Sequence, residues 1–177
     1  MKRVKLINDP AELVALFRAV DSEIRRNVLS TLAEGWTMIS DLINKFGEEA
    51  NDITVYYEKF KLIESRWEVN KETGRPEKSY RTFYNAFQIS TSLTFDETQE
   101  LLTVVLMTDK EFVNYESKIV DLIGEEGTFA NDVGRDIGVT SLTLKGLVRR
   151  SCIILFVKTS LRTGNLTIMS GRLVLDF

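Results

Sequence analysis

The sequence predicts a mainly helical α+β protein with two winged helix-turn-helix domains in tandem. One reason is the segment 51–83, which reads as an amphipathic helix followed by a β-hairpin with a basic tip. The other reason is that the same order of elements recurs in the C-terminal half. We expect a first domain at 1–90, a connecting helix at 91–109 and a second domain at 110–177.

The N-terminal part of the chain carries helix start and stop signals. Pro10 follows Asp9 at a helix start, where the N–H that proline lacks would have no partner. A second helix restarts at Asp21-Ser22, and Gly35 ends it. A short support helix is expected after it, at Thr37–Phe46.

The next helix, from Asn51, has an apolar and a polar face. Apolar residues recur at steps of three and four, which predicts one buried stripe: Ile53, Tyr57, Phe60, Ile63 and Trp67. The opposite face consists of Thr54, Val55, Glu58, Lys59 and Lys61. Tyr57 falls on the buried stripe, whereas Tyr56 is expected to be exposed and able to meet a phosphate or a thymine methyl group.

A hairpin with a basic tip is predicted after this helix. Its turn is Thr73-Gly74-Arg75-Pro76, in which the proline stiffens the backbone beside Arg75. A helix of roughly 10–12 Å diameter fits the DNA major groove, and basic side chains on a hairpin can bind the flanking phosphates. The expected DNA contacts of the first domain are Asn51, Thr54, Val55, Tyr56, Lys59, Lys61, Lys71, Arg75, Lys78 and Arg81.

A second series of elements starts at Lys110. Three helices and a strand–turn–strand follow in the same order as before, with the turn at 162–165. The segments Asp41–Gly47 and Asp132–Gly138 have the same length and matching apolar positions. The expected DNA contacts of the second domain are Lys145, Arg149, Arg150 and Arg162. The alternative is a copy kept for dimerisation or for recruiting a partner.

An acidic segment connects the two series. Residues 93–136 hold three basic and eleven acidic side chains, whereas residues 137–175 hold six basic and no acidic ones. Thr94 or Asp96 is a suitable N-cap for the helix that begins this segment. The end of that helix is apolar nearly all round, so we expect it to be buried between the domains or against its twin in a homodimer. The acidic surface would suit basic partners such as the transcription machinery.

The composition excludes several classes of function. With no histidine and one cysteine, Cys152, the chain can form neither an internal disulfide nor a Cys/His zinc site, and histidine-dependent triads are ruled out. The apolar runs are shorter than the roughly 18 residues of a membrane helix, and no signal-peptide pattern is found. We expect a cytoplasmic protein that is not an enzyme, with no cofactor, metal or membrane contact.

Four elements carry a resemblance to a known family. Together, DSEIRRNVLSTLAEG (21–35), ISDL (39–42), the helix from Asn51 and GRPEKSYRTF (74–83) resemble the ArsR-type winged-helix transcriptional regulators, notably archaeal ones, over residues 10–87. The resemblance implies that a wing carrying Arg75 and Lys78 reaches the DNA backbone or minor groove. Metal-sensing members carry a cysteine pair or histidines that are missing here, which implies a regulator without metal sensing. A tandem arrangement is similar to that of euryarchaeal regulators that activate archaellum genes.

The sequence thus predicts a DNA-binding transcriptional regulator that reads double-stranded promoter DNA. The helix from Asn51 and the wing at 71–81 would make the contacts. The alternative is a winged-helix module that recruits a protein partner without reading DNA, because winged folds host many functions.

Overall fold

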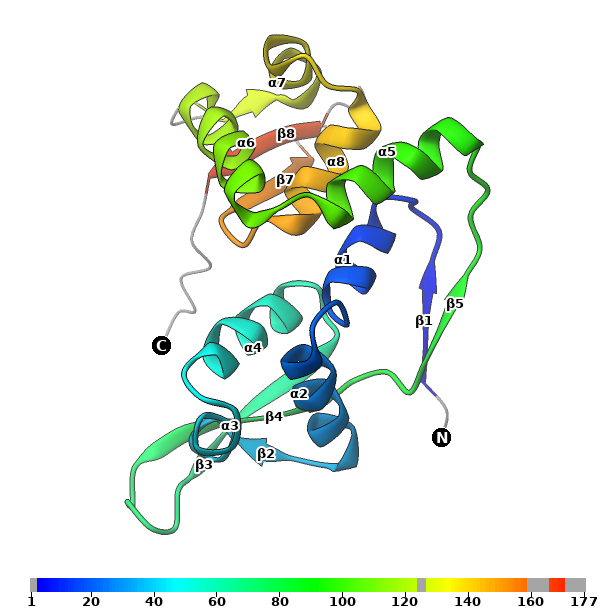
Figure 1. Ribbon diagram of the computed structural model, residues 1–177. Helices are drawn as coiled ribbons and strands as arrows, with labels where there is room; N and C mark the ends of the chain where they lie inside the picture. The colour runs from blue at the N-terminus through cyan, green and yellow to red at the C-terminus, as the bar shows by residue number, and fades with distance from the viewer. Residues whose placement is uncertain (1–2, 124–126, 159–165, 171–177) are drawn as a thin grey trace. The chain divides into compact units, whose positions relative to one another are not determined.

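The computed structural model describes residues 3–123, 127–158 and 166–170. The chain divides into two compact units (Figure 1). Unit 1 comprises Met1–Asn8 and Leu16–Ser90, and unit 2 comprises Asp9–Ala15 and Thr91–Phe177. Helix α1 (Glu12–Arg18) begins in unit 2 and ends in unit 1.

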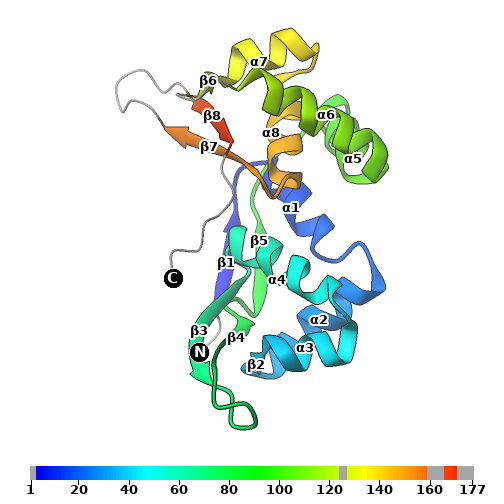
Figure 2. The same ribbon diagram turned by 90° about the vertical axis from the view of Figure 1, so that its left-hand side faces the viewer.

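Unit 1 combines three helices with a small antiparallel sheet. Its helices are α2 (Glu23–Glu34), α3 (Ile39–Phe46) and α4 (Glu49–Lys59). Its antiparallel strands are β2 (Thr37–Met38), β3 (Ile63–Val69) and β4 (Pro76–Thr82), in the order β2-β4-β3 (Figure 2). The helices pack on the sheet through buried apolar residues that include Val28, Leu32, Leu42 and Ile53.

Local signals explain where these helices begin and end. The hydroxyl of Ser22 accepts a hydrogen bond from the Arg25 amide at 3.3 Å and so caps α2, which starts where Asp21-Ser22 predicted a helix. Gly47, with a φ of 84°, separates α3 from α4. A residue without a Cβ adopts this conformation with the least strain, so the chain turns sharply between the two helices.

The prediction of one helix from Asn51 to Trp67 is wrong. Helix α4 ends at Lys59, Lys61 adopts a left-handed φ of 53°, and β3 begins at Ile63. Apolar residues at 63, 67 and 69 alternate with charged ones at 64, 66 and 68, which is the period of a strand. Trp67 is 56% exposed on the sheet rather than part of a buried stripe.

A parallel pair of short strands was not predicted. Strand β1 (Val4–Ile7) pairs in parallel with β5 (Ala86–Ile89) in unit 1, with Val4 opposite Ala86 and Ile7 opposite Ile89. Strands of four residues are too short for a two-residue period to stand out in the sequence.

Unit 2 repeats the order of elements found in unit 1. Its helices after α1 are α5 (Phe95–Leu106), α6 (Asp109–Leu122), α7 (Ala130–Ile137) and α8 (Ser141–Arg150). Its described strands are β6 (Thr128–Phe129), β7 (Ile154–Lys158) and β8 (Leu166–Ser170), in the order β6-β8-β7. In each unit, a helix is followed by a short strand, two helices and two antiparallel strands. The second of these two strands, β4 or β8, lies in the middle of the three-stranded sheet.

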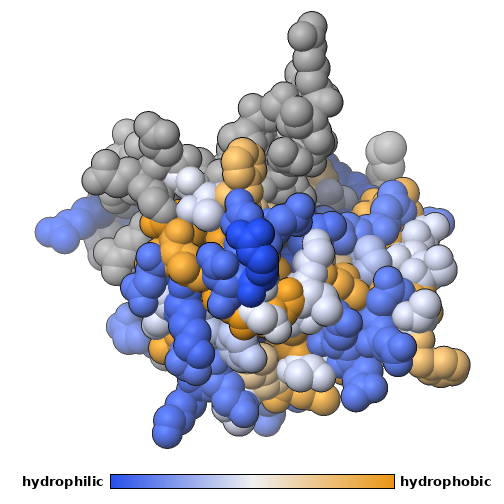
Figure 3. All heavy atoms as spheres, turned by 90° about the horizontal axis from the view of Figure 1, so that it is seen from above, coloured by the Kyte–Doolittle hydropathy of each residue, from blue (hydrophilic) through white to orange (hydrophobic). Residues whose placement is uncertain are grey.

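The connecting region begins as predicted. Thr94 caps α5 in a capping box with Glu97, and Thr108 starts α6, the separate helix expected from Lys110. The end of α5 is not fully buried within the single chain. Leu101 and Val104 face the interior, whereas Leu106 is 77% exposed. Seen from above, the molecular surface has hydrophobic patches between hydrophilic side chains (Figure 3).

Within the described ranges, no helix has both the length and the apolar character needed to cross a lipid bilayer.

Candidate nucleic-acid interface

Only one side of helix α4 is accessible. Asn51 and Asp52 are exposed in its first turns, and Val55 and Lys59 are half-buried further along. Asn51 and Val55 are four residues apart, so they lie on the same face of the helix. The buried side chains of α4 are Ala50, Ile53, Thr54, Tyr56 and Tyr57.

Thr54 and Tyr56 are not accessible, which corrects two predicted contacts. Thr54 is fully buried, and its hydroxyl donates a hydrogen bond to the Asn51 carbonyl at 2.8 Å. The ring of Tyr56 is 3% exposed and packs 4.7 Å from the ring of Phe60. The prediction that Tyr56 is exposed is therefore wrong. Helix α4 is covered on more than one side, so a single apolar stripe underestimates how much of it is buried.

Tyr57 lies in the core, as predicted. Its hydroxyl is 2.8 Å from the carbonyl oxygens of both Ala19 and Arg25, and it has one proton to donate between them. Burial raises the pKa of Tyr57 well above its ordinary value, and the positive charge of Arg25 offsets only part of this effect. The contact fixes α4 against the start of α2.

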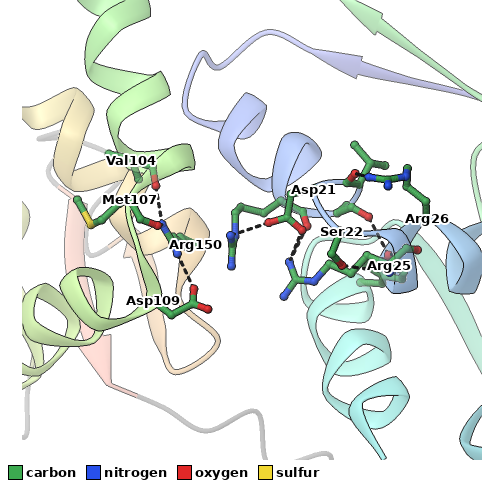
Figure 4. A network of polar contacts seen from close by, with 12 residues as sticks. Asp21, Ser22, Arg25, Arg26, Val104, Met107, Asp109 and Arg150 are labelled. Carbon is green, nitrogen blue, oxygen red and sulfur yellow. Dashed lines mark hydrogen bonds and ion pairs between the residues drawn. The ribbon is translucent and has the colours of Figure 1, made fainter. Parts of the chain in front are cut away.

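The arginines at the start of α2 hold the chain between α1 and α2. Arg25 donates to the Arg18 carbonyl at 2.5 Å and lies 3.6 Å from Asp21. Arg26 donates to the Val20 carbonyl at 2.9 Å (Figure 4). These side chains therefore fix the position from which the helix-turn-helix starts.

The tip of the β3–β4 hairpin presents two exposed cations, Lys71 and Arg75. The Asn70 amide donates to the Arg75 carbonyl at 2.9 Å, and the Gly74 amide donates to the Asn70 carbonyl at 2.8 Å. Gly74 has a φ of 68°, which glycine adopts readily. The turn is therefore closed by its own backbone. Lys61 is also exposed, but it lies beyond the end of α4.

Two other predicted contacts of the wing are engaged within unit 1. The Lys78 ammonium lies 3.4 Å from the Glu58 carboxylate, with 15% of its side chain exposed. Arg81 forms an ion pair with Glu64 at 2.5 Å, and its guanidinium lies 4.6 Å from the ring centre of Trp36. Lys78 thus ties the hairpin to α4, and neither cation is as available to a phosphate as Arg75.

The basic residues of unit 2 are less available than predicted. Lys145 is half-buried, and Arg149 lies 3.8 Å from Asp9 and 3.9 Å from Glu12. Arg162 lies outside the described residues.

Arg150 is buried, which corrects another predicted DNA contact. It is 4% exposed, and it donates to the Val104 and Met107 carbonyls at 2.8 and 2.7 Å. It also pairs with Asp109 at 2.7 Å (Figure 4). The guanidinium thus satisfies carbonyls at the end of α5, which a helix C-terminus leaves without partners.

A polar cluster beneath the wing tip was not predicted. The Glu77 carboxylate accepts hydrogen bonds from the Ser40 amide at 2.5 Å and from the Asn70 side chain at 2.8 Å. Partial burial acts to raise the pKa of Glu77, but the hydrogen bonds from Ser40 and Asn70 outweigh it and leave the pKa below its ordinary value. One feature of the sequence could have indicated this cluster: Asn70 follows a strand, and asparagine commonly organises a turn at such a position.

The family of the chain follows from a comparison with known families. The sequence model described as ArsR transcriptional regulator matches residues 7–161, which include most of both units. The chain belongs to the ArsR family of transcriptional regulators. The resemblance predicted from the first unit is thereby confirmed, and the match extends it into the second. No curated protein matches the chain.

The accessible groups considered for DNA contact in this ArsR-family regulator form two sets in unit 1. One set lies on α4 and includes Asn51, Asp52, Val55 and Lys59. The other lies on the wing tip and consists of Lys71 and Arg75. Asp52 was not among the predicted residues, although it lies next to Asn51 in the first turn. Its charge would repel phosphates, but a carboxylate can accept a hydrogen bond from cytosine.

Proposed function

We propose that this ArsR-family regulator binds promoter DNA through unit 1, with α4 in the major groove and the β3–β4 tip on the flanking backbone or minor groove. The observation that carries the proposal is a helix-turn-helix with an accessible helix face, followed in the same unit by a hairpin with an exposed basic tip. These are the two parts with which winged helices bind DNA.

Each accessible group has a chemistry suited to its place. The Asn51 amide can donate to and accept from an adenine edge, and Val55 can contact a thymine methyl group. Lys71 and Arg75 are exposed cations that suit phosphates. Base reading is therefore assigned to α4, and electrostatic affinity to the tip.

The chain would contain two winged-helix domains, at 1–90 and 110–177, joined through α5. The common order of elements and the common strand order of the two sheets support this division. DNA reading is assigned to the first domain, because Arg149 lies near two carboxylates and Arg150 is buried. The second domain would recruit a partner, such as the transcription machinery.

The regulator would not sense metal through thiolates or imidazoles. The absence of histidine and the single cysteine support this, because such a site needs several of these ligands. The resemblance of a tandem arrangement to archaellum regulators supports motility genes as targets to test.

A homodimer would form through α5. Phe95, Leu102 and Leu106 are spaced so that they share one face, and each is exposed, Phe95 to 96% and Leu106 to 77%. Together with Thr98, Gln99, Thr103 and Met107 they line a shallow groove. A two-fold axis through this face would provide two reading helices, as palindromic sites require.

The test is a fluorescence-anisotropy titration of the full chain with a duplex from upstream of its own gene and a scrambled duplex, at two salt concentrations. The proposal expects preference for the native duplex, with an affinity that falls as salt rises by about 0.9 logarithmic units per phosphate contact. No binding at low salt would overturn it and favour a module that binds a protein partner.

A further inference from the structure

We propose that Glu77 is a positioning residue for DNA binding: with Asn70 and Ser40 it anchors the wing tip to the start of α3 and so orients Lys71 and Arg75. The inference rests on the proposed function, because the orientation matters only if the tip contacts DNA. Glu77 itself would not touch the nucleic acid.

Glu77 is linked to the support helix α3. Helix α3 has no side-chain cap of its own, since its N-cap residue is Met38. The first amides of a helix lack partners within it. The Ser40 amide finds one in the Glu77 carboxylate, 2.5 Å away and 37 residues later in the chain. A negative charge there is also favoured by the helix dipole.

The same carboxylate is also linked to the turn of the β3–β4 hairpin. The other oxygen of Glu77 accepts from the Asn70 side-chain amide at 2.8 Å. The amide oxygen of Asn70 in turn accepts from the backbone amides of Glu72 and Thr73, at 2.9 and 3.1 Å. Asn70 is 8% exposed, so its polar groups depend on these partners. A continuous chain of hydrogen bonds thus leads from α3 to the residues of the tip.

These hydrogen bonds order the part of the hairpin that carries the two exposed cations. Lys71 and Arg75 flank the backbone that Asn70 organises, and both side chains are exposed. A tip that is already ordered loses less conformational entropy when it binds. The anchor therefore favours binding although it adds no contact to DNA.

A charge-matched pair of variants separates this role from simple electrostatics. Glu77→Gln keeps an oxygen for Ser40 but directs an N–H donor at the N–H donor of Asn70. Glu72→Gln removes the same charge from the same hairpin, at an exposed residue that joins the anchor through its backbone amide and not through its side chain. By charge alone, both variants would bind DNA slightly more tightly than the wild type. The anchor predicts instead that Glu77→Gln binds roughly threefold to tenfold more weakly than Glu72→Gln.

The decisive readout is a double-mutant comparison in the full chain, titrated with the fluorescent duplex from upstream of its own gene. In a Lys71→Ala/Arg75→Ala background, Glu77→Gln should cause no further loss, because the groups it positions are gone. A merely destabilising substitution would lower affinity in both backgrounds. Amide hydrogen exchange of the unbound protein should also be faster at Glu72 and Thr73 in Glu77→Gln than in the wild type.

The results separate a failure of the Glu77 anchor from a failure of DNA binding by the wing. If Lys71→Ala/Arg75→Ala weakens binding but Glu77→Gln and Glu72→Gln bind equally well, the anchor is overturned and the DNA-binding wing stands. If removing both cations leaves the affinity unchanged, or if the wild type binds no duplex, the proposed wing contact and the anchor both fail.

Discussion

At the scale of single residues, the largest differences from the sequence prediction concern polar side chains that the fold uses internally. Arg150 and Tyr56 have types common at DNA interfaces, yet the structure buries both. Lys78 and Arg81 are engaged by Glu58 and Glu64. Sequence periodicity shows which face of a helix is apolar, but not which neighbour supplies a carboxylate or a carbonyl to a cation on another face.

Arg150 should matter for folding because its guanidinium is buried. Arg150→Ala removes hydrogen bonds to the Val104 and Met107 carbonyls and should lower the free energy of unfolding by about 3 kcal/mol. Asp109→Asn is the matched control. The Asp109 side chain is 83% exposed, so its ion pair with Arg150 should contribute no more than about 1 kcal/mol. Urea unfolding of both variants checks this, and equal losses would contradict the assigned role.

Tyr57 and Tyr80 should make the protein sensitive to alkali. Burial raises the pKa of Tyr80 from 10.0 to about 12 and raises that of Tyr57 further. The unfolded chain therefore loses these protons first as the pH rises, so stability should fall from about pH 10 upward. Unfolding in urea at increasing pH measures this fall. It should be smaller in Tyr57→Phe and Tyr80→Phe, whereas an unchanged pH dependence would contradict the burial.

At the scale of elements, the sequence indicated most helices but only some of the strands. Caps and glycines marked α2, α3 and α5, because these signals are local. The predicted helix extended into β3 because Phe60, Ile63 and Trp67 recur at the spacing of a helix. The alternation from Ile63 to Val69 was present in the sequence, and only pairing with β4 decides between the two periods.

Two glycines should respond to alanine with opposite signs. Gly47→Ala places a Cβ at a φ of 84°, with no atom within 4 Å, and should destabilise unit 1 by about 1 kcal/mol through backbone strain alone. Gly146→Ala lies inside α8, where the new methyl group would meet Val14 and Val104 at 3.4–3.5 Å. Because alanine favours a helix, this change should be neutral or stabilise by up to about 1 kcal/mol. Thermal unfolding of the two variants tests the contrast, and a destabilised Gly146→Ala would show that α8 packs more tightly against its neighbours.

At the scale of the whole molecule, the repeated order of elements was visible in the sequence because turn residues and apolar spacings recur. The accessible surfaces were not visible, because they depend on which side chains the neighbouring elements cover. Helix α5 shows this most plainly. Its apolar end was expected to be buried between the domains or in a homodimer, and Leu106 at this end is exposed in the single chain.

This exposed face should determine the oligomeric state. Leu106→Glu should convert the proposed dimer to a monomer while leaving the unfolding temperature of the monomer nearly unchanged, because 77% of the residue is already exposed. Lys110→Glu, on the exposed side of α6, is a control that adds the same charged side chain nearby. Sedimentation velocity measures both. A wild-type monomer, or a Leu106→Glu variant that remains a dimer, would remove α5 from the interface.

In the proposed complex, α4 reads bases while the wing tip supplies electrostatic affinity. The most direct measurement is the salt dependence of binding to native and scrambled duplexes for the wild type, Asn51→Ala and Arg75→Ala. We predict that Arg75→Ala weakens binding to both duplexes alike and lowers the salt slope by about one. Asn51→Ala should reduce the preference for the native duplex and leave the slope unchanged. If both variants match the wild type in affinity, preference and slope, unit 1 does not contact DNA through these residues.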